Sequence, residues 1–384
     1  MEDRKVLHIA LVGGQPAPLY LAIEDSLAEK FILIHSDSTV AIARKLSADI
    51  VETMDLPVEL MRFDPLDYFG AKEGFGKLLS TYADWRIEVN ISGGTKLWSI
   101  AMAVLSNTYA NVELLYVDQN SRINNFNTGK VRNAEPLEIA DFLKYNQIVD
   151  PDSLQHTRFS DYTAEDLDLL PQIKGIRDRF IRAFNTLTNT DSSDSGRFAN
   201  TKGFYRDPAS GSEIKWDRKA QYVKLSFIGY GGATEEFELK SPHAFNLVTS
   251  SGWFEYEVAT ILKKWPSCKD MWLNVVFPYD NKRPKNEIDI IVSTGKKLLF
   301  VECKIQIKRN ITDIDKFASA VNNYGGSGAK AIFITQQNMG KLAEEKCTTN
   351  SISNFSLKKH KSDSDMHKAL FQLLDEMMQT SNAR

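Results

Sequence analysis

Between residues 6 and 118, short apolar runs alternate with segments of helical period, and this alternation constrains the fold more than any other feature. Most of the runs are continuously apolar, which is typical of strands buried on both faces of a sheet. Strand and helix in alternation predict an α/β domain with a parallel, doubly wound sheet. Residues 120–133 are polar and rich in turn formers, so we expect a hairpin appended to that sheet. The apolar runs occupy residues 6–12, 31–35, 58–63, 87–91 and 112–117, with helical segments at 18–30, 38–54 and 95–109.

The rest of the chain divides into two further parts. Residues 151–249 combine a helical stretch up to residue 190, a linker rich in Ser and Asp, and a turn-rich aromatic segment that should form a small antiparallel β unit. Residues 250–384 have the pattern of a mixed α/β domain, and residues 1–150 form the parallel sheet. In the last part we expect helices near 253–264, 313–322 and 359–378, and strands near 272–277, 287–292, 298–304 and 329–335.

Charge is distributed unevenly along the 384 residues, whose formal net charge is −3. The chain has 47 basic and 50 acidic side chains. Residues 1–240 hold 27 of the basic and 35 of the acidic ones, a net charge of −8. The remaining 20 and 15 fall in residues 241–384, a net of +5. An acidic front and a basic back favour contact between the C-terminal part and a polyanion, although charged runs often only solvate a surface.

Cysteine content and apolar run length indicate the cellular setting. Cys268, Cys303 and Cys347 are too few and too widely spaced for a disulfide framework or a zinc knuckle. No apolar run approaches the roughly 20 residues that a membrane span needs. The first residues carry both signs of charge, unlike the start of a secretory signal. We therefore expect a cytoplasmic protein that has no membrane contact.

The C-terminal part contains two adjacent strand segments that carry acidic residues. Residues 286–292 and 298–304 flank a short turn with Gly295, so a hairpin would bring Asp289 beside Glu302, with the register open by a residue. Because side chains alternate along a strand, Glu302 and Lys304 share one face. Two close carboxylates repel one another unless a cation lies between them, and a hard divalent metal held by carboxylates, a carbonyl and waters is the usual solution. Lys304 could orient a water or stabilise developing charge, so the three residues together favour metal-assisted phosphodiester hydrolysis. The alternative is a solvated strand with a Glu–Lys pair on the protein surface.

The flanking sequence agrees with a nucleic-acid substrate. Between Lys282 and Arg309 there are eight basic residues and three acidic ones, which would leave a positive groove if the acids held metal. Upstream, Glu255 lies in the first turn of a predicted helix that begins near Trp253. On spacing alone, Glu255 is either a further site carboxylate or a favourable charge at a helix N-terminus.

These residues resemble the PD-(D/E)xK nuclease superfamily, over about residues 250–340. The matching positions are Glu255 on the helix, Asp289 on one strand, and Glu302 with Lys304 on the next. The resemblance implies a restriction-endonuclease-like fold in which Glu255, Asp289, Glu302 and Lys304 are catalytic. It also implies that Asp289, Glu302 and the backbone carbonyl of Cys303 bind Mg²⁺ or Mn²⁺, that Glu255 is a further candidate metal ligand, and that Lys304 assists the attacking water.

In the N-terminal part, small polar residues follow three of the predicted strands. In a parallel sheet, ligands bind beyond the carboxyl ends of the strands. Glycines there let backbone N–H groups approach an anion, and a Thr-Lys pair adds a hydroxyl and a cation; the alternative is that tight turns simply need glycine. Neither a GxGxxG turn nor full Walker spacing is present. The candidate ligand-binding residues are Gly13, Gly14, Gln15, Pro16, Ser36, Ser38, Thr39, Ser92, Gly93, Gly94, Thr95 and Lys96.

The Ser92–Lys96 turn, together with the Gly-Gly-Gln turn after the first strand, resembles the CRISPR-associated Rossmann fold (CARF) sensor family. The resemblance covers about residues 1–145 and implies a Rossmann-like domain that pairs as a homodimer. It further implies that Gln15, Ser92, Thr95 and Lys96 contact a cyclic oligoadenylate at the dimer interface.

A CARF sensor followed by a PD-(D/E)xK domain resembles the ancillary nucleases of type III CRISPR defence over nearly the whole chain. This implies a homodimeric endonuclease that cuts DNA or RNA when cyclic tetra-adenylate binds, with residues 151–249 as the expected transmission element. The alternatives are a catalytically inactive, ligand-gated nucleic-acid-binding regulator and a restriction-type enzyme without an activator. The sequence leaves open DNA against RNA, strandedness, Mg²⁺ against Mn²⁺, the size of the activator ring, and whether the sensor degrades its ligand.

Overall fold

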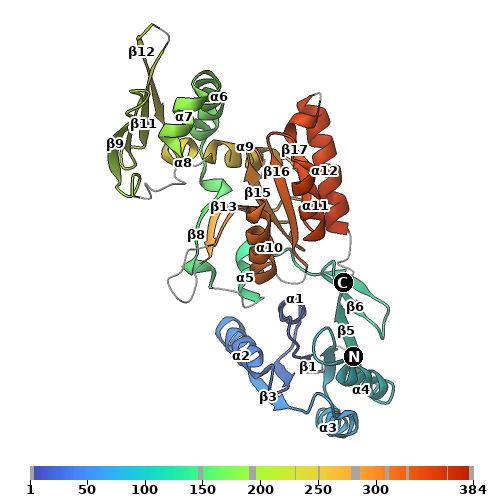
Figure 1. Cartoon of the computed structure of the whole chain (residues 1–384). Coiled ribbons are helices and arrows are strands. Elements are labelled where there is room, and N and C mark those ends of the chain that lie inside the picture. Colours follow the sequence, from blue (N-terminus) through green and yellow to red (C-terminus); the bar gives the residue numbers. More distant parts are fainter. Residues whose placement is uncertain are drawn as a thin grey trace.

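The computed structural model describes residues 4–145, 150–189, 196–229, 231–249, 251–277, 286–307, 311–325, 328–360 and 362–379. The described residues form sheets of seven, four and six strands, with helices packed against them (Figure 1). The seven-stranded sheet belongs to the N-terminal part, the four-stranded sheet to the middle part, and the six-stranded sheet mainly to the C-terminal part.

The N-terminal sheet has the strand order β3-β2-β1-β4-β5-β6-β7, and its first five strands are parallel. The parallel pairing of these five strands confirms the predicted parallel sheet. The last two strands pair antiparallel, which confirms the appended polar hairpin. The strands are β1 (Val6–Leu11), β2 (Lys30–His35), β3 (Val58–Arg62), β4 (Arg86–Asn90), β5 (Val112–Val117), β6 (Arg122–Asn125) and β7 (Val131–Asn133).

Helices cover both faces of this sheet. On one face, α1 (Ala17–Glu24) and α2 (Val40–Met54) share a core with alternate residues of β1. On the other face, α3 (Tyr68–Thr81) and α4 (Lys96–Ser106) pack against the remaining residues of β1. The sequence analysis leaves α3 unassigned because its glycines weaken the helical pattern. One of them is required by packing, since a Cβ at Gly74 would lie 2.4 Å from the ring of Phe63.

The middle part contains the expected antiparallel unit, with strand order β12-β11-β10-β9. Its inner face packs on α6, α7 and α8 in one hydrophobic core, which α9 and the C-terminal sheet share. The elements are β9 (Lys202–Arg206), β10 (Glu213–Asp217), β11 (Tyr222–Ile228), β12 (Thr234–Lys240), α6 (Ala164–Arg179), α7 (Ile181–Thr188) and α8 (Ala244–Val248).

The C-terminal sheet is mixed, with strand order β17-β16-β15-β14-β13-β8. β13, β14 and β15 pair antiparallel, whereas β15, β16 and β17 pair parallel. Helices α10 and α11 share a core with one face, and α9 and α12 with the other, so the predicted mixed α/β fold is confirmed. The elements are β13 (Asp270–Phe277), β14 (Asn286–Ser293), β15 (Leu298–Lys304), β16 (Lys330–Thr335), β17 (Ser353–Ser356), α9 (Gly252–Leu262), α10 (Thr312–Tyr324), α11 (Lys341–Thr349) and α12 (Asp363–Gln379).

One edge strand of this sheet comes from a segment that the sequence analysis assigned to helix. β8 (Gln155–Arg158) pairs antiparallel with β13, between the short 3₁₀ helices at Pro151–Ser153 and Phe159–Asp161. The expectation that residues 151–190 are entirely helical is therefore wrong. The four residues of β8 are polar and only partly buried, so no apolar alternation marks them as a strand.

The N-terminal and C-terminal parts share apolar contacts. α5 (Ile139–Tyr145) packs against α1 and against β13 and β14, and residues of both parts lie in one continuous core. Figure 1 shows α5 between the two sheets, with the N-terminal sheet at the bottom of the view. Within the described ranges, none of the helices combines the length and the apolar character that crossing a bilayer requires.

Candidate active site and ligand-binding edge

The hairpin of β14 and β15 places the predicted acidic residues side by side. Ile290 pairs with Val301, so the same register extended by one residue sets Asp289 opposite Glu302. The Asp289 carboxylate accepts a hydrogen bond of 2.7 Å from the backbone N–H of Cys303. Asp289 and Glu302 are 8 % and 9 % exposed, which removes them from the screening of bulk water.

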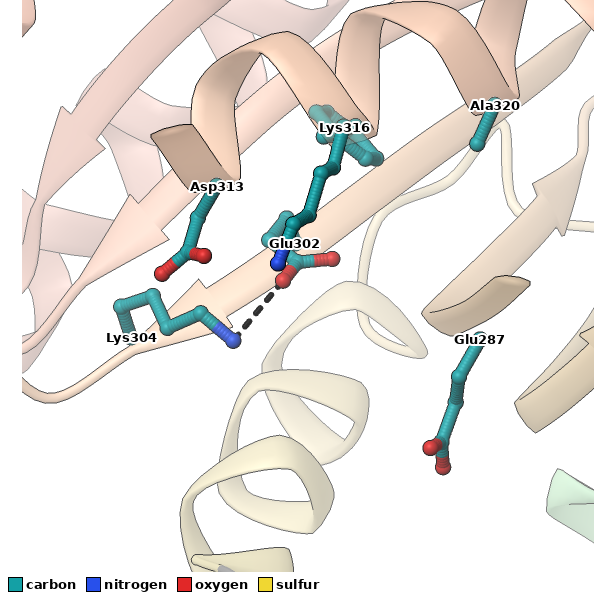
Figure 2. Close-up of a pocket in the computed structure, with 7 residues that line it drawn as sticks. Glu287, Glu302, Lys304, Asp313, Lys316 and Ala320 are labelled. Carbon is teal, nitrogen blue, oxygen red and sulfur yellow. Dashed lines mark ion pairs between the residues drawn. The ribbon is translucent and has the colours of Figure 1, made fainter. Parts of the chain in front are cut away.

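Lys304 contacts Glu302 directly, with 2.8 Å between its Nζ and the Glu302 carboxylate. Both residues line a cavity of about 150 Å³, together with Glu287 of β14 and the α10 residues Asp313 and Lys316. Figure 2 shows Asp313 and Lys316 extending from α10 toward the pair. The sequence analysis missed these two residues of α10, although an Asp and a Lys three residues apart lie on one face of a helix.

Electrostatic interactions connect Glu255 of α9 to the same cluster. Burial, then repulsion by Asp289 and Glu287, holds the pKa of Glu255 well above its ordinary value. Burial and repulsion by Asp289 also raise the pKa of Glu302 to about 8, against the attraction of Lys304. Burial raises the pKa of Asp289 as well, opposed by Lys304 and by the hydrogen bond from Cys303. The four residues of the predicted motif therefore lie close enough to perturb one another.

Lys304 is the cation of this cluster. Burial alone would lower its pKa, but the attraction of Asp289 and Glu302 outweighs burial and holds the pKa well above its ordinary value. Lys304 is therefore protonated in this state and donates hydrogen bonds rather than accepting protons.

The Cys303 side chain lies apart from the cavity. It is buried in the core that α9 and α12 share with this face of the sheet, whereas Glu302 lines the cavity beside α10. Burial, then the nearby carboxylates, raises the pKa of the Cys303 thiol well above its ordinary value, so the thiol is neutral. What Cys303 offers the site is its backbone.

A second group of residues, which the sequence analysis also missed, interacts with Glu255. Asn274 of β13 has φ of +53°. Between β13 and β14 the pairing is interrupted at Asn274, the position opposite Asp289 in the register of the neighbouring pairs. Its side chain is hydrogen-bonded to Tyr162, whose pKa burial and then Glu255 raise well above its ordinary value. Tyr162 stacks on Tyr256 of α9 with 4.3 Å between the ring centroids. A non-glycine residue at positive φ often marks a functional site, but this backbone conformation is visible in a structure and not in a sequence.

In the N-terminal part, the turns after β1 and β4 pack against each other. A Cβ at Gly93 would lie 2.2 Å from the carbonyl oxygen of Leu11, and one at Gly13 would lie 2.7 Å from the nitrogen of Gly94. Gly94 also has φ of +69°. Packing of the two turns therefore explains these three glycines, whereas Gly14 has open space around its Cβ position.

These turns lie at the carboxyl ends of the parallel strands, and several hydroxyl groups there stabilise the turns themselves. The Thr95 hydroxyl caps α4 by accepting from the N–H of Trp98 at 3.3 Å. The Ser92 hydroxyl accepts from the N–H of Val117 at 2.7 Å, and so ties the turn after β4 to the end of β5. After β2, the hydroxyls of Ser36, Ser38 and Thr39 bond to one another within a single turn.

Three predicted ligand residues remain to be placed, namely Gln15, Pro16 and Lys96. Gln15 and Ser92 line a cavity of about 360 Å³ that continues onto the C-terminal part. Pro16 is the N-cap residue of α1, and its carbonyl accepts a hydrogen bond from the N–H of Leu19 at 2.8 Å. Lys96 is exposed in the first turn of α4.

One family model is similar to the N-terminal domain. Residues 7–142 match the sequence model of the Card1 CARF domain. The N-terminal domain matches the CARF family. A search of the curated proteins finds no match to this chain.

Solved structures match the whole chain. Can2 from Sulfobacillus thermosulfidooxidans, in complex with cyclic tetra-adenylate, has a TM-score of 0.65 and 17 % identity, over 98 % of this chain and 100 % of that one. Protein VC1899 from Vibrio cholerae has a TM-score of 0.66 and 14 % identity, over 97 % and 98 %. A type III CRISPR defence DNA nuclease activated by cyclic oligoadenylate has a TM-score of 0.50 and 14 % identity, over 88 % of this chain and 46 % of that one. The chain therefore shares its fold with the first two over nearly its whole length.

Proposed function

We propose that this protein is a metal-dependent endonuclease of type III CRISPR defence that cuts DNA or RNA when cyclic tetra-adenylate binds its CARF domain. The observation that carries the proposal is the mutual perturbation of Glu255 on α9, Asp289 on β14, and Glu302 and Lys304 on β15. A solvated Glu–Lys surface pair would not be buried in this way. Buried carboxylates with strongly perturbed pKa values, beside a partly buried lysine, are typical of a catalytic site.

The donor chemistry of this site fits a hard divalent cation. As they stand, the described residues contain no group of three or more His, Cys, Asp or Glu arranged to hold a metal ion. Yet Asp289 and Glu302 are buried and repel one another, with Lys304 as the cation between them. A second positive charge would relieve that repulsion, and carboxylate oxygens are the ligands that Mg²⁺ and Mn²⁺ prefer.

Asp289, Glu302 and the backbone carbonyl of Cys303 are the residues that would hold the metal, with Glu255 as a further candidate. A bound Mg²⁺ or Mn²⁺ supplies positive charge to the reacting phosphate. In hydrolysis a water oxygen bonds to phosphorus, the bond from phosphorus to the leaving oxygen breaks, and that oxygen gains a proton. The protonated Lys304 can orient this water or stabilise the charge that develops on the phosphate oxygens.

The CARF match supports a cyclic oligoadenylate as the activator. Can2, which shares the fold, binds cyclic tetra-adenylate, and Gln15, Ser92, Thr95 and Lys96 follow the strands of the sheet where ligands of parallel sheets bind. We therefore include all the predicted ligand residues in the proposed binding edge, with Lys96 the exposed cation among them.

The proposed homodimer is supported by exposed apolar side chains near α3 and α4. Leu66 and Phe69 are 82 % and 81 % exposed, and Ile100 and Val104, one turn apart on α4, are about half exposed. A second copy of the chain would bury these side chains, which a monomer leaves in water.

The test is cleavage of labelled single-stranded RNA, single-stranded DNA and plasmid in Mg²⁺ or Mn²⁺, with and without cyclic tetra-adenylate. Wild type, Glu302→Ala and the matched surface variant Glu345→Ala would be compared, since Glu345 is exposed on α11 of the same domain. We expect cleavage that needs the ligand and disappears only in Glu302→Ala. Cleavage without the ligand would refute the activator, and ligand binding without cleavage of any substrate would favour the inactive regulator.

A further inference from the structure

The turn between β14 and β15 is joined to the CARF domain. Leu137 N–H donates to the carbonyl of Gly295 at 2.9 Å, and the Ser293 hydroxyl donates to the carbonyl of Leu137 at 2.6 Å. Gly295 has φ of +79°, and a Cβ there would lie 2.7 Å from Pro136. The tip of the hairpin that carries Asp289 and Glu302 therefore fits closely against the end of the CARF domain.

This tip forms one wall of the cavity of about 360 Å³ that Gln15 and Ser92 line. The wall from the C-terminal domain includes Lys296 and Lys297 of the turn and Lys330 at the start of β16. Lys330 pairs with Leu299 in the sheet, which places it close to the turn. The opposite wall comes from the carboxyl ends of the CARF strands, so each domain supplies half of the cavity.

The charge of the cavity is positive. Its charged lining residues are the three lysines and Asp118. The Asp118 carboxylate is already paired with Arg122 at 2.7 Å. Lys297 is 6 % exposed, and its Nζ donates to the carbonyl of Met378 at 2.6 Å.

Two of these lysines, Lys297 and Lys330, also repel one another. Burial lowers the pKa of Lys330, and the charge of Lys297 lowers it further. Burial lowers the pKa of Lys297 too, against the weaker attraction of Asp118. Ammonium groups that crowd a cavity in this way are stabilised by an anion between them, and a phosphate oxygen is the natural partner for lysine.

We propose that Lys296, Lys297 and Lys330 form a phosphate-binding wall, through which the C-terminal domain holds phosphodiester groups of the cyclic oligonucleotide bound at Gln15 and Ser92. This inference rests on the proposed activator. A cavity of this volume accommodates part of an oligonucleotide rather than a whole ring, so the wall completes a site that the CARF edge begins.

Such a wall also gives the ligand a direct way to favour one arrangement of the two domains. A ligand shifts a conformational equilibrium only through contacts that differ between its two states. Contacts from Lys296 and Lys297 would exist only when the hairpin tip lies against the ligand. The same hairpin carries Asp289 and Glu302, so the ligand acts on the element that positions the carboxylates.

The test is equilibrium binding of labelled cyclic tetra-adenylate to the full-length protein. Lys296→Gln, Lys330→Gln and the double variant would be compared with wild type and with Lys341→Gln, an exposed lysine of α11 outside this cavity. We expect each substitution in the cavity to weaken binding about tenfold or more, because a charge-assisted hydrogen bond is lost, and Lys341→Gln to bind like wild type. Thermal melting of each variant verifies the fold. Lys297 is left unchanged because it also anchors α12.

The outcomes separate this inference from the proposed function. Equal binding by wild type and both cavity variants would refute the wall and leave the activator intact. Variants that bind cyclic tetra-adenylate normally but bind labelled single-stranded RNA or DNA more weakly would also refute it, because the lysines would then belong to the substrate groove. No binding of cyclic tetra-adenylate by wild type would refute the activator, and this inference with it.

Discussion

Without its metal, the proposed active site should destabilise the protein as pH rises. The perturbation that tests this is Glu302→Gln, which keeps the shape of the side chain and removes its charge. In the folded protein, burial and Asp289 raise the pKa of Glu302 from 4.5 to about 8, whereas in the unfolded chain the carboxyl recovers its ordinary value.

The sign and size of the effect follow from proton binding. Between pH 4.5 and about 8, the folded state holds a proton on Glu302 that the unfolded state has released, so rising pH favours unfolding. Each unit of pKa difference is worth about 1.4 kcal/mol, so the loss accumulates to about 5 kcal/mol above pH 8. That is a large share of the free energy of unfolding of a single domain, which is typically roughly 5–15 kcal/mol.

The assay is urea unfolding of the full-length protein in EDTA, at intervals from pH 5 to pH 8.5. We expect the free energy of unfolding of wild type to fall steadily over this range, and that of Glu302→Gln to fall much less. Glu345→Gln, the same change at an exposed position, should follow wild type. Adding Mn²⁺ should restore stability to wild type at the higher pH values, since a ligand that binds only the folded state stabilises it.

Parallel pH profiles for wild type and Glu302→Gln would refute this reasoning. They would mean that Glu302 ionises normally, with its charge neutralised by Lys304 alone. In that case the cluster would be a surface ion pair, and the electrostatic argument for a metal would fail with it.

Four further predictions test separate parts of the molecule. Lys304→Met should reduce ligand-stimulated cleavage about 100-fold or more, with cyclic tetra-adenylate binding unchanged in a binding assay. Glu88 is buried, but His8, Ser26 and Arg86 outweigh burial and lower its pKa to about 2, so Glu88→Gln should cost about 3 kcal/mol at pH 7 in urea unfolding. Wild type should lose that advantage as pH falls from 4.5 toward 2, and an unchanged difference across this range would contradict the assignment. Gly93→Ala, which forces the turns after β1 and β4 apart, should lower thermal stability and ligand affinity, whereas Gly14→Ala should leave stability unchanged. Ser293→Ala, which removes the bond to Leu137, should retain ligand binding but weaken its stimulation of cleavage, and full stimulation would show that this bond carries no coupling.

Local pattern predicted much of the N-terminal sheet and the hairpin of the C-terminal sheet. Strands buried on both faces are continuously apolar, and this makes the parallel sheet recognisable from residues alone. Alternation along β15 places Glu302 and Lys304 on one face, and a short turn brings Asp289 beside them. Each of these inferences needs only neighbours in sequence.

The features that the sequence does not predict depend on contacts between distant segments. β8 is polar, and it becomes a strand only because β13 offers it an open edge about 115 residues later in the chain. Asp313 and Lys316 reach the cavity because α10 packs across the sheet. The glycines after β1 and β4 are the opposite case, because the sequence suggested a function that packing can replace. Their pattern suggested an anion-binding site, but the close packing of the two turns already explains three of these glycines.

The arrangement of the hairpin bears on how ligand binding could reach the active site. The sequence analysis predicts transmission through residues 151–249, and this stays a prediction. The structure offers a second path, because β14 runs from Asp289 to a turn that contacts the N-terminal domain. Gly295 lies six residue steps beyond Asp289, a span of about 20 Å at about 3.4 Å per step. Both strands of the hairpin are hydrogen-bonded to neighbours on each side, so we expect the hairpin to move as one piece rather than to bend between its ends. We therefore expect a displacement at Lys296 to reach the carboxylates through the hairpin itself. A path through the middle part would have to pass through β8 or α9, and the shorter path needs fewer contacts to hold two discrete arrangements.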